Sequence, residues 1–125
     1  MIDHISLGTR AYADAVAFYA KVLPALGVEL QRDTGAEAAF GTPERWCFFL
    51  YPVEAGQTVV GKGTHVAWQA ASRDAVMAVH ARAIELGACD LFSPRRRPDI
   101  SPTYFGAMFT DPDGHRIEVN AELPA

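Results

Sequence analysis

The chain has 125 residues and a mass of 13.6 kDa, which leaves room for one compact domain. Half of the residues are hydrophobic and 21% are charged, a composition that excludes a disordered chain. The net charge of −4 and the pI near 5.5 argue against a nucleic-acid-binding protein. No apolar run reaches the roughly 18–20 residues of a membrane span. Because the first residues lack the pattern of a signal peptide, we expect a cytoplasmic protein.

The first half of the chain predicts one helix among four strands. Residues 2–7 form a short β-type run, and apolar residues with helical spacing follow from about 11 to 26. Gly27 is a typical C-terminal stop for that helix. Residues 28–31, 38–41 and 46–53 are predicted as strands, and the first of these is predicted to lie at a sheet edge.

The second half repeats this order after a Gly-rich connector. Residues 64–69 are predicted as a strand, and Ser72 is a plausible N-cap for a helix that runs to about residue 86. Gly87 ends the helix. Strands are then predicted near residues 89–92, 104–110 and 115–120, and residues 93–102 are predicted as an inserted loop.

The two halves match one another in sequence. Residues 14–16 recur at an offset of 60, His4 matches His65 at 61, and the segment from residue 40 matches that from residue 109 at 69. Such internal self-similarity indicates a duplicated unit. We therefore predict an α+β fold of two βαβββ modules, about residues 1–55 and 62–125.

Strand parity places two histidines and one carboxylate on polar faces. In a strand, alternate side chains share a face, so His4 lies opposite the aliphatic side of its strand, as do His65 and Glu118 in theirs. If these polar faces converge, they form a set that holds Fe(II), Mn(II) or Zn(II) and leaves coordination positions open. Taken singly, each residue is also consistent with a solvated surface position.

Four segments together resemble the vicinal oxygen chelate superfamily, which includes glyoxalases, extradiol dioxygenases and bleomycin-resistance proteins. They are Asp-His-Ile-Ser-Leu at 3–7, the helix segment Ala-Val-Ala-Phe-Tyr at 15–19, Thr-His-Val-Ala-Trp at 64–68, and Asp-Pro-Asp-Gly-His-Arg-Ile-Glu at 111–118. The resemblance implies paired modules whose mixed sheets curl into a cup around a divalent metal (iron, manganese, zinc or nickel). It carries the metal ligands onto His4, His65 and Glu118, gives Glu118 a catalytic role, and implies a homodimer.

One position departs from the glyoxalase I pattern, which has a fourth ligand, a glutamate, in the first module. Aligning Pro43 with Pro112 places Phe49 opposite Glu118. The loss of a carboxylate that would move a substrate proton disfavours glyoxalase I activity. The three-ligand set is closer to the dioxygenases and thiol transferases, in which the metal chelates or polarises substrate oxygens.

Several side chains are candidates for contact with substrate. Arg97, in the run 95–97, has the fork geometry that binds carboxylate or phosphate, and the alternative is a solvated loop. Tyr104 is a candidate catalytic donor to an oxyanion or an ordinary core aromatic. Phe49 and Tyr51 form an apolar wall of the cup or part of the core, and Gln69 shares the face of the second-module histidine.

The remaining cysteines and histidines are predicted to be structural. Cys47 and Cys89 are predicted as small buried residues in the reduced state, although one disulfide between them stays open. His80 and His115 fall outside the proposed face and are expected at the surface. The rival to a metal-dependent enzyme is a metal-free protein that sequesters an aromatic or cationic compound in the same cup.

Overall fold

A computed structural model describes residues 1–122 as two sheets of four strands each, with two α-helices. The first module contains β1 (Ile5–Thr9), α1 (Tyr12–Val22), the 3-10 helix η1 (Leu23–Leu26), β2 (Glu29–Asp33), β3 (Ala38–Gly41) and β4 (Trp46–Pro52). The second contains β5 (His65–Gln69), α2 (Arg73–Glu85), β6 (Asp90–Arg96), β7 (Tyr104–Thr110) and β8 (Arg116–Glu122). The prediction of an α+β fold with two βαβββ modules is confirmed.

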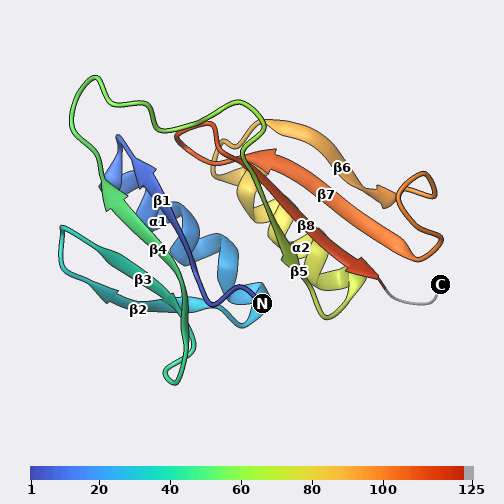
Figure 1. The fold of residues 1–125 in the computed structure, drawn as a ribbon. Helices are drawn as coiled ribbons and strands as arrows, with labels where there is room; N and C mark the ends of the chain where they lie inside the picture. Colours follow the sequence, from blue (N-terminus) through green and yellow to red (C-terminus); the bar gives the residue numbers. More distant parts are fainter. Residues whose placement is uncertain (123–125) are drawn as a thin grey trace.

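The two sheets have the same topology. Their strand orders are β1-β4-β3-β2 and β5-β8-β7-β6, and in each the first strand pairs parallel with the last while the other pairs are antiparallel. In Figure 1 the sheets lie side by side, each with its helix behind it. The strands β1 and β5 are sheet edges and run in opposite directions in this view.

Each helix packs one apolar face against its sheet, and the two faces merge into one core. Ser72 caps α2, its Oγ accepting from the backbone N–H of Ala75 at 3.1 Å. Phe18 of α1 contacts Phe109 of β7, with ring centroids 6.2 Å apart. Aromatic rings therefore pack across the boundary between the modules.

Polar contacts also join the modules. The Tyr19 hydroxyl on α1 donates to the Asp111 carboxylate, which follows β7, at 2.6 Å. The backbone N–H of Arg10 donates to Asp113 at 2.8 Å. Asp111 and Asp113 belong to the turn between β7 and β8. These two bonds therefore attach that turn to α1 and to the residues that precede it.

Two local predictions were wrong in part. The predicted loop of residues 93–102 begins later, because β6 extends from Asp90 to Arg96 and only Arg97 of the arginine run follows it; Pro94 is tolerated because β6 is an edge strand. The cysteines are free thiols, as expected of the reduced state, but Cys89 is exposed and Cys47 is only partly buried. None of the helices within residues 1–122 has the length and apolar character that a membrane crossing requires.

Candidate metal site

His65 and Glu118 meet on the open face of the second sheet, the face that its helix does not cover. His65 begins β5, and Glu118 lies on the neighbouring strand β8, where it pairs in register with Ala67. The His65 Nε2 and Glu118 Oε1 atoms are 2.8 Å apart, and the two side chains are 40% and 12% exposed. Strand parity predicted this adjacency, since both residues point away from the core.

Two further side chains fix the other oxygen of this carboxylate. The Tyr104 hydroxyl and the Asn120 side-chain amide both donate to Glu118 Oε2, each at 2.9 Å. The carboxylate is thereby oriented with Oε1 toward the histidine. Asn120 was not among the predicted site residues, although its position two residues after Glu118 on one strand is a usable signal.

Tyr104 reaches the carboxylate because residue 106 is glycine. A Cβ atom built on Gly106 would collide with the Tyr104 hydroxyl and ring. Tyr104 is buried, and burial together with its bond to Glu118 raises the pKa of the phenol well above its ordinary value. The phenol is therefore protonated at neutral pH and acts as a donor.

These donors fit a divalent metal. A histidine nitrogen and a carboxylate oxygen already converge, and outer hydrogen bonds orient the carboxylate as they do around metal ligands. His65 and Glu118 would hold such an ion, and the hydrogen bonds from Tyr104 and Asn120 would orient the Glu118 carboxylate. Two of the three predicted ligands are thus assembled within one chain.

His4 lies elsewhere. Its Nδ1 atom is 2.7 Å from the Asp3 carboxylate, and its ring packs edge-on against Phe49 with centroids 5.2 Å apart. The strands β1 and β5 run in opposite directions (Figure 1), and His4 borders a cavity that is lined on its other side by residues 66–68 of β5. Within the described residues, His4 makes no hydrogen bond to His65 or Glu118.

The first module carries an aromatic side chain where the second carries its acid. Phe49 pairs in register with Ser6 on β1, as Glu118 pairs with Ala67 on β5, so the two positions are structurally equivalent. The Phe49 ring stacks on Tyr51 at 6.5 Å. The open face of the first module is therefore aromatic.

The two other candidate substrate residues lie on the second sheet. Gln69 is exposed at the end of β5, paired in register with Asn120. Arg97 directly follows β6 and is held by Asp99 through two bonds of 2.8 and 2.7 Å. The backbone N–H of Arg97 donates to the Tyr104 carbonyl at 3.4 Å, so this arginine borders the site.

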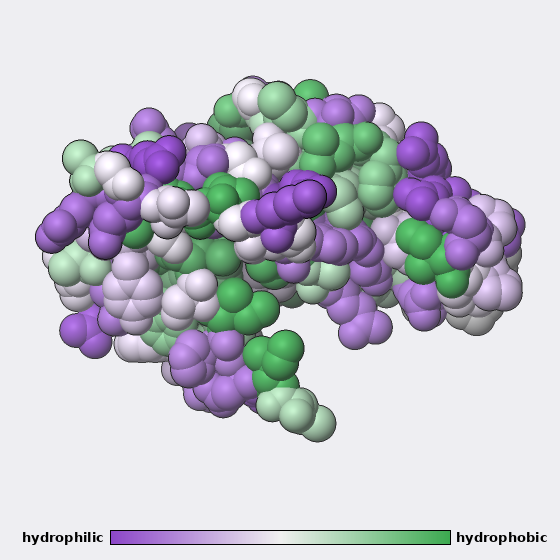
Figure 2. Space-filling model, turned by 45° about the horizontal axis from the view of Figure 1, so that its top comes forward, coloured by the Kyte–Doolittle hydropathy of each residue, from purple (hydrophilic) through white to green (hydrophobic). Residues whose placement is uncertain are grey.

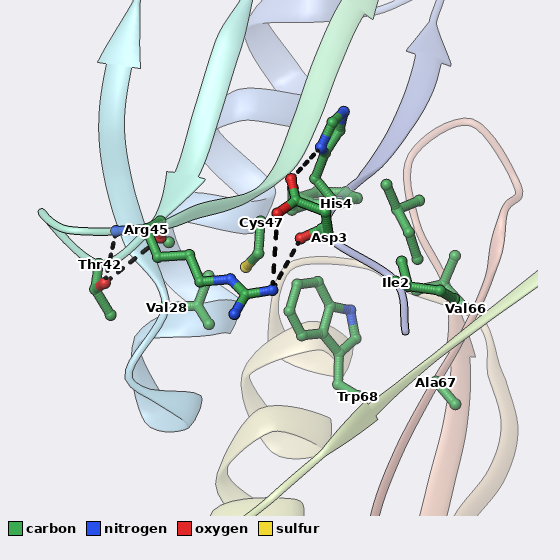
Figure 3. Close-up of a pocket in the computed structure, with 13 residues that line it drawn as sticks. Ile2, Asp3, His4, Val28, Thr42, Arg45, Cys47, Val66, Ala67 and Trp68 are labelled. Carbon is green, nitrogen blue, oxygen red and sulfur yellow. Dashed lines mark hydrogen bonds and ion pairs between the residues drawn. The ribbon is translucent and has the colours of Figure 1, made fainter.

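A separate cavity of about 350 Å³ lies between the modules (Figure 3). Apolar and aromatic side chains line much of it, including Trp68, and an ion pair of 4.0 Å between Arg45 and Asp3 lies at its wall. His4 borders this cavity too. Burial raises the pKa of the Cys47 thiol within it, so the thiol is protonated at neutral pH.

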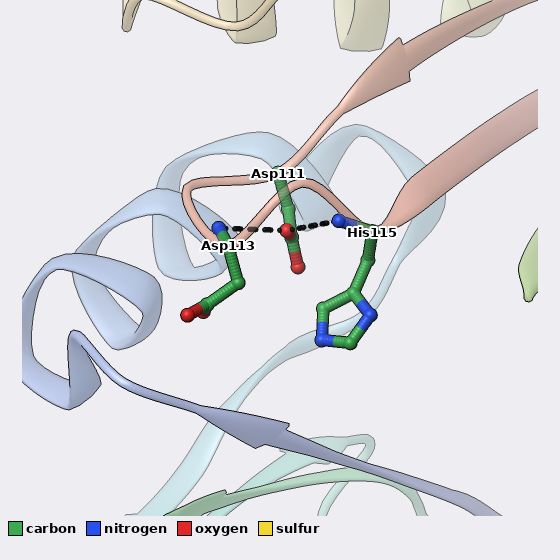
Figure 4. Close-up of side chains that lie close together, drawn as sticks. All are labelled: Asp111, Asp113 and His115. Atoms are coloured by element: carbon green, nitrogen blue, oxygen red, sulfur yellow. Dashed lines mark hydrogen bonds between the residues drawn. The ribbon is translucent and has the colours of Figure 1, made fainter. Parts of the chain in front are cut away.

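A group of Asp111, Asp113 and His115 also has potential metal-binding atoms, all within 4.8 Å of one another. Figure 4 shows that the Asp111 carboxylate instead accepts the backbone N–H groups of the other two residues. It also accepts the hydroxyl of Tyr19, and burial raises the pKa of this carboxyl above its ordinary range. The Asp111 carboxylate therefore stabilises the turn between β7 and β8 and the contact between the two modules.

The two remaining histidines are buried, which contradicts their prediction as surface residues. His115 is only 2% exposed, and its Nε2 lies 3.0 Å from the Gly8 carbonyl. Because a carbonyl only accepts, this nitrogen carries the proton. His80 is 9% exposed and lies 2.9 Å from the Asp90 carboxylate. Both find partners that a periodicity argument does not reveal.

Comparison with known proteins identifies the family of the chain. Residues 1–119 match the family model of the Glyoxalase/Bleomycin resistance protein/Dioxygenase superfamily. The chain belongs to this superfamily. No curated protein sequence matches it.

Solved structures share the fold at low sequence identity. A glyoxalase/bleomycin resistance protein from Albidiferax ferrireducens T118 superposes with a TM-score of 0.84 at 23% identity, covering 98% of this chain and 99% of that one. A putative glyoxalase from Bacillus halodurans gives a TM-score of 0.76 at 20% identity, covering 97% and 95%. The fosfomycin resistance protein FosX from Listeria monocytogenes, as an E126Q mutant complexed with Mn(II) and 1S,2S-dihydroxypropylphosphonic acid, gives 0.71 at 21%, covering 98% and 90%.

Proposed function

We propose that this protein is a metal-dependent enzyme that binds a small oxygen-bearing organic substrate on a divalent ion. The observation that carries the proposal is the convergence of His65 Nε2 and Glu118 Oε1 on one face. Tyr104 and Asn120 hold the carboxylate from its other side, an arrangement typical of metal ligands with outer support. The FosX neighbour, described as an Mn(II) complex, supports this choice of chemistry.

His4 is proposed as the third ligand, contributed by a second copy of the chain. Within one chain it lies against Asp3 and Phe49 instead of the His65–Glu118 pair. The site is therefore incomplete in a monomer, and we propose a homodimer with shared sites. Sedimentation at micromolar concentration is expected to give a dimer, and a monomer alone would overturn this part.

The side chains suit substrate binding and polarisation better than glyoxalase-type isomerisation. A divalent metal, when bound, supplies a Lewis acid that polarises and orients substrate oxygens. Tyr104 keeps its proton and holds Glu118 in place, and a role as donor to substrate requires it to leave that carboxylate. Phe49 provides no second carboxylate at the equivalent position of the first module, so a proton shuttle between two acids is absent there.

A metal-free binding protein is the second candidate, favoured by the aromatic face of the first module. Phe49 packs between His4 and Tyr51, with centroid distances of 5.2 and 6.5 Å. Stacked rings of this kind bind planar aromatic or cationic compounds without a metal. In this alternative, the His65–Glu118 pair is a structural hydrogen bond.

Metal content and chelator sensitivity separate the two candidates. The protein, purified without chelator, is expected to retain a divalent ion in substoichiometric or full amount. Binding of a catechol probe is expected to require the ion and to disappear with EDTA. Absence of any ion, together with catechol or aromatic dye binding that EDTA leaves unchanged, would favour the metal-free protein.

A further inference from the structure

The edge strand β6 and the residue that follows it place two arginine side chains over a single phenylalanine ring. The guanidinium carbon of Arg95 lies 5.0 Å from the centroid of Phe92, and that of Arg97 lies 5.1 Å from the same centroid. Contact with an aromatic face attracts and orders a guanidinium group. The two cations are thus positioned by the protein before any ligand arrives.

These cations share a face with the candidate metal ligands. On β6, Arg95 pairs in register with Gly106 and Phe92 pairs with Met108. Met108 in turn pairs with Glu118 on β8. Directly paired residues of antiparallel strands point to the same face, so Arg95, Phe92 and Glu118 lie on one surface.

The charge of the two arginines is only partly balanced. Asp99 occupies the fork of Arg97 with bonds of 2.8 and 2.7 Å. Arg95 forms no hydrogen bond or ion pair with any residue of the described segment 1–122. Figure 2 shows that hydrophilic side chains predominate at the end of the molecule where β6 and β7 lie. The Arg95 guanidinium therefore has no carboxylate partner within residues 1–122, whereas the neighbouring Arg97 guanidinium is bound by Asp99.

The Asp99 carboxylate shows which chemistry this surface accepts. Its two oxygens bind the planar fork of Arg97 side by side, the geometry in which carboxylates, phosphates and phosphonates bind arginine. Asp99 is exposed and lies two residues further along the chain. A ligand oxyanion can replace it without uncovering a buried group.

We propose that Arg95 and Arg97, ordered on Phe92, form a subsite for an oxyanion, so that substrates of this protein carry a carboxylate, phosphonate or phosphate group. The proposal deepens the proposed function, because the oxyanion subsite would orient a substrate whose other oxygens lie at His65 and Glu118. The subsite itself contains no metal ligand. In the free protein Asp99 occupies the Arg97 fork and competes with the ligand.

The test is a calorimetric titration of the metal-free protein with inorganic phosphate and with propylphosphonate at low ionic strength. Arg95→Gln and Arg97→Gln are each expected to weaken binding about tenfold, since each removes a charge-assisted contact. Asp99→Asn is expected to strengthen binding several-fold, because it removes the competing carboxylate. Opposite signs for Arg97→Gln and Asp99→Asn distinguish a binding subsite from a purely structural ion pair.

Arg32→Gln is the matched control. Arg32 is an exposed arginine on β2, the corresponding edge strand of the first sheet, and its removal changes the net charge equally. It is expected to leave phosphate affinity within about twofold. No binding by the wild type, or an equal loss in Arg32→Gln and Arg95→Gln, would overturn the subsite.

Repeating the titration with Mn(II) separates this inference from the proposed function. Loss of oxyanion binding in Arg95→Gln, in a protein that binds no Mn(II), would support the subsite and contradict the metal site. Mn(II) binding that depends on Glu118, together with oxyanion binding that neither arginine substitution changes, would support the metal site and contradict the subsite.

Discussion

The open faces of the two sheets have one backbone register and different side chains. Phe49 occupies in the first module the position that Glu118 occupies in the second, each paired with the first strand of its module. Around Phe49 the neighbours are aromatic, whereas around Glu118 they are hydrogen-bond donors. The duplicated fold thus supports an apolar face in one module and an acidic, ligand-like face in the other.

This difference shows what the fold constrains and what it leaves free. The core faces of both modules are filled by aliphatic and aromatic side chains that pack against the helices, because burial favours them there. The open faces are not packed against a helix. A single difference there, Phe49 in one module and Glu118 in the other, changes the face from aromatic to acidic while the strand register is kept.

The largest effect expected on stability concerns the boundary that holds the two faces in place. Tyr19→Phe removes the hydroxyl that donates to buried Asp111 and leaves a carboxylate oxygen without its partner. We expect the free energy of unfolding to fall by about 2 kcal/mol, measured by urea denaturation, with metal affinity unchanged.

Tyr12→Phe is the control for this prediction. The Tyr12 hydroxyl, also on α1, donates to Asp33 at 2.7 Å, but this carboxylate is exposed. Water replaces the lost bond, so a change below about 1 kcal/mol is expected. Equal losses in the two variants would show that the bond to Asp111 does not tie the modules together.

The next largest effect concerns the donors that make the second face different. Tyr104→Phe removes one of two hydrogen bonds to Glu118 Oε2, and Gly106→Ala displaces the Tyr104 ring by collision. Both are expected to lower Mn(II) affinity about tenfold, as the loss of outer support does at other metal sites. Isothermal titration calorimetry measures this directly.

Tyr51→Phe provides the counterpart on the first face. Its hydroxyl donates to Glu37 at 3.0 Å. This bond belongs to the first module, whereas the His65–Glu118 pair lies on the second sheet. Mn(II) affinity is expected to stay within about twofold of the wild type. A tenfold loss here, or none in Tyr104→Phe, would contradict the positioning role of Tyr104.

The smallest effect comes from making the first face resemble the second. Phe49→Glu places a carboxylate at the position equivalent to Glu118, beside the ring of His4. We expect Mn(II) affinity to rise a few-fold, because an added carboxylate ligand attracts a divalent ion. Phe49→Gln, which has the same shape without the charge, is expected to give no gain, and equal gains in both would exclude ligation.

The sequence predicted relations within a sheet better than relations between sheets. Parity and the internal repeat placed His65 and Glu118 together and marked Phe49 as the equivalent of Glu118, because both arguments depend only on strand pairing. The place of His4 depends on how β1 and β5 are oriented across the core. The contacts that join the modules, such as the Tyr19–Asp111 bond, link residues far apart in the chain, and no local pattern reveals them.

Buried polar groups and strand ends were the other features that the sequence concealed. His115 is buried because the Gly8 carbonyl of the other module accepts its ring N–H, a contact between residues far apart in the chain. The extension of β6 through Pro94 to Arg96 depends on its place at a sheet edge, where a missing backbone donor costs little.

The central claim is that Glu118 and His65 form a metal site, and an Mn(II) titration of Glu118→Gln tests it most directly. Glu122→Gln is the matched control, since Glu122 lies on the same strand and accepts from Ser101 instead. We predict that Glu118→Gln loses at least about 100-fold in Mn(II) affinity while Glu122→Gln binds as the wild type does. Equal Mn(II) affinity in Glu118→Gln and the wild type would contradict the account.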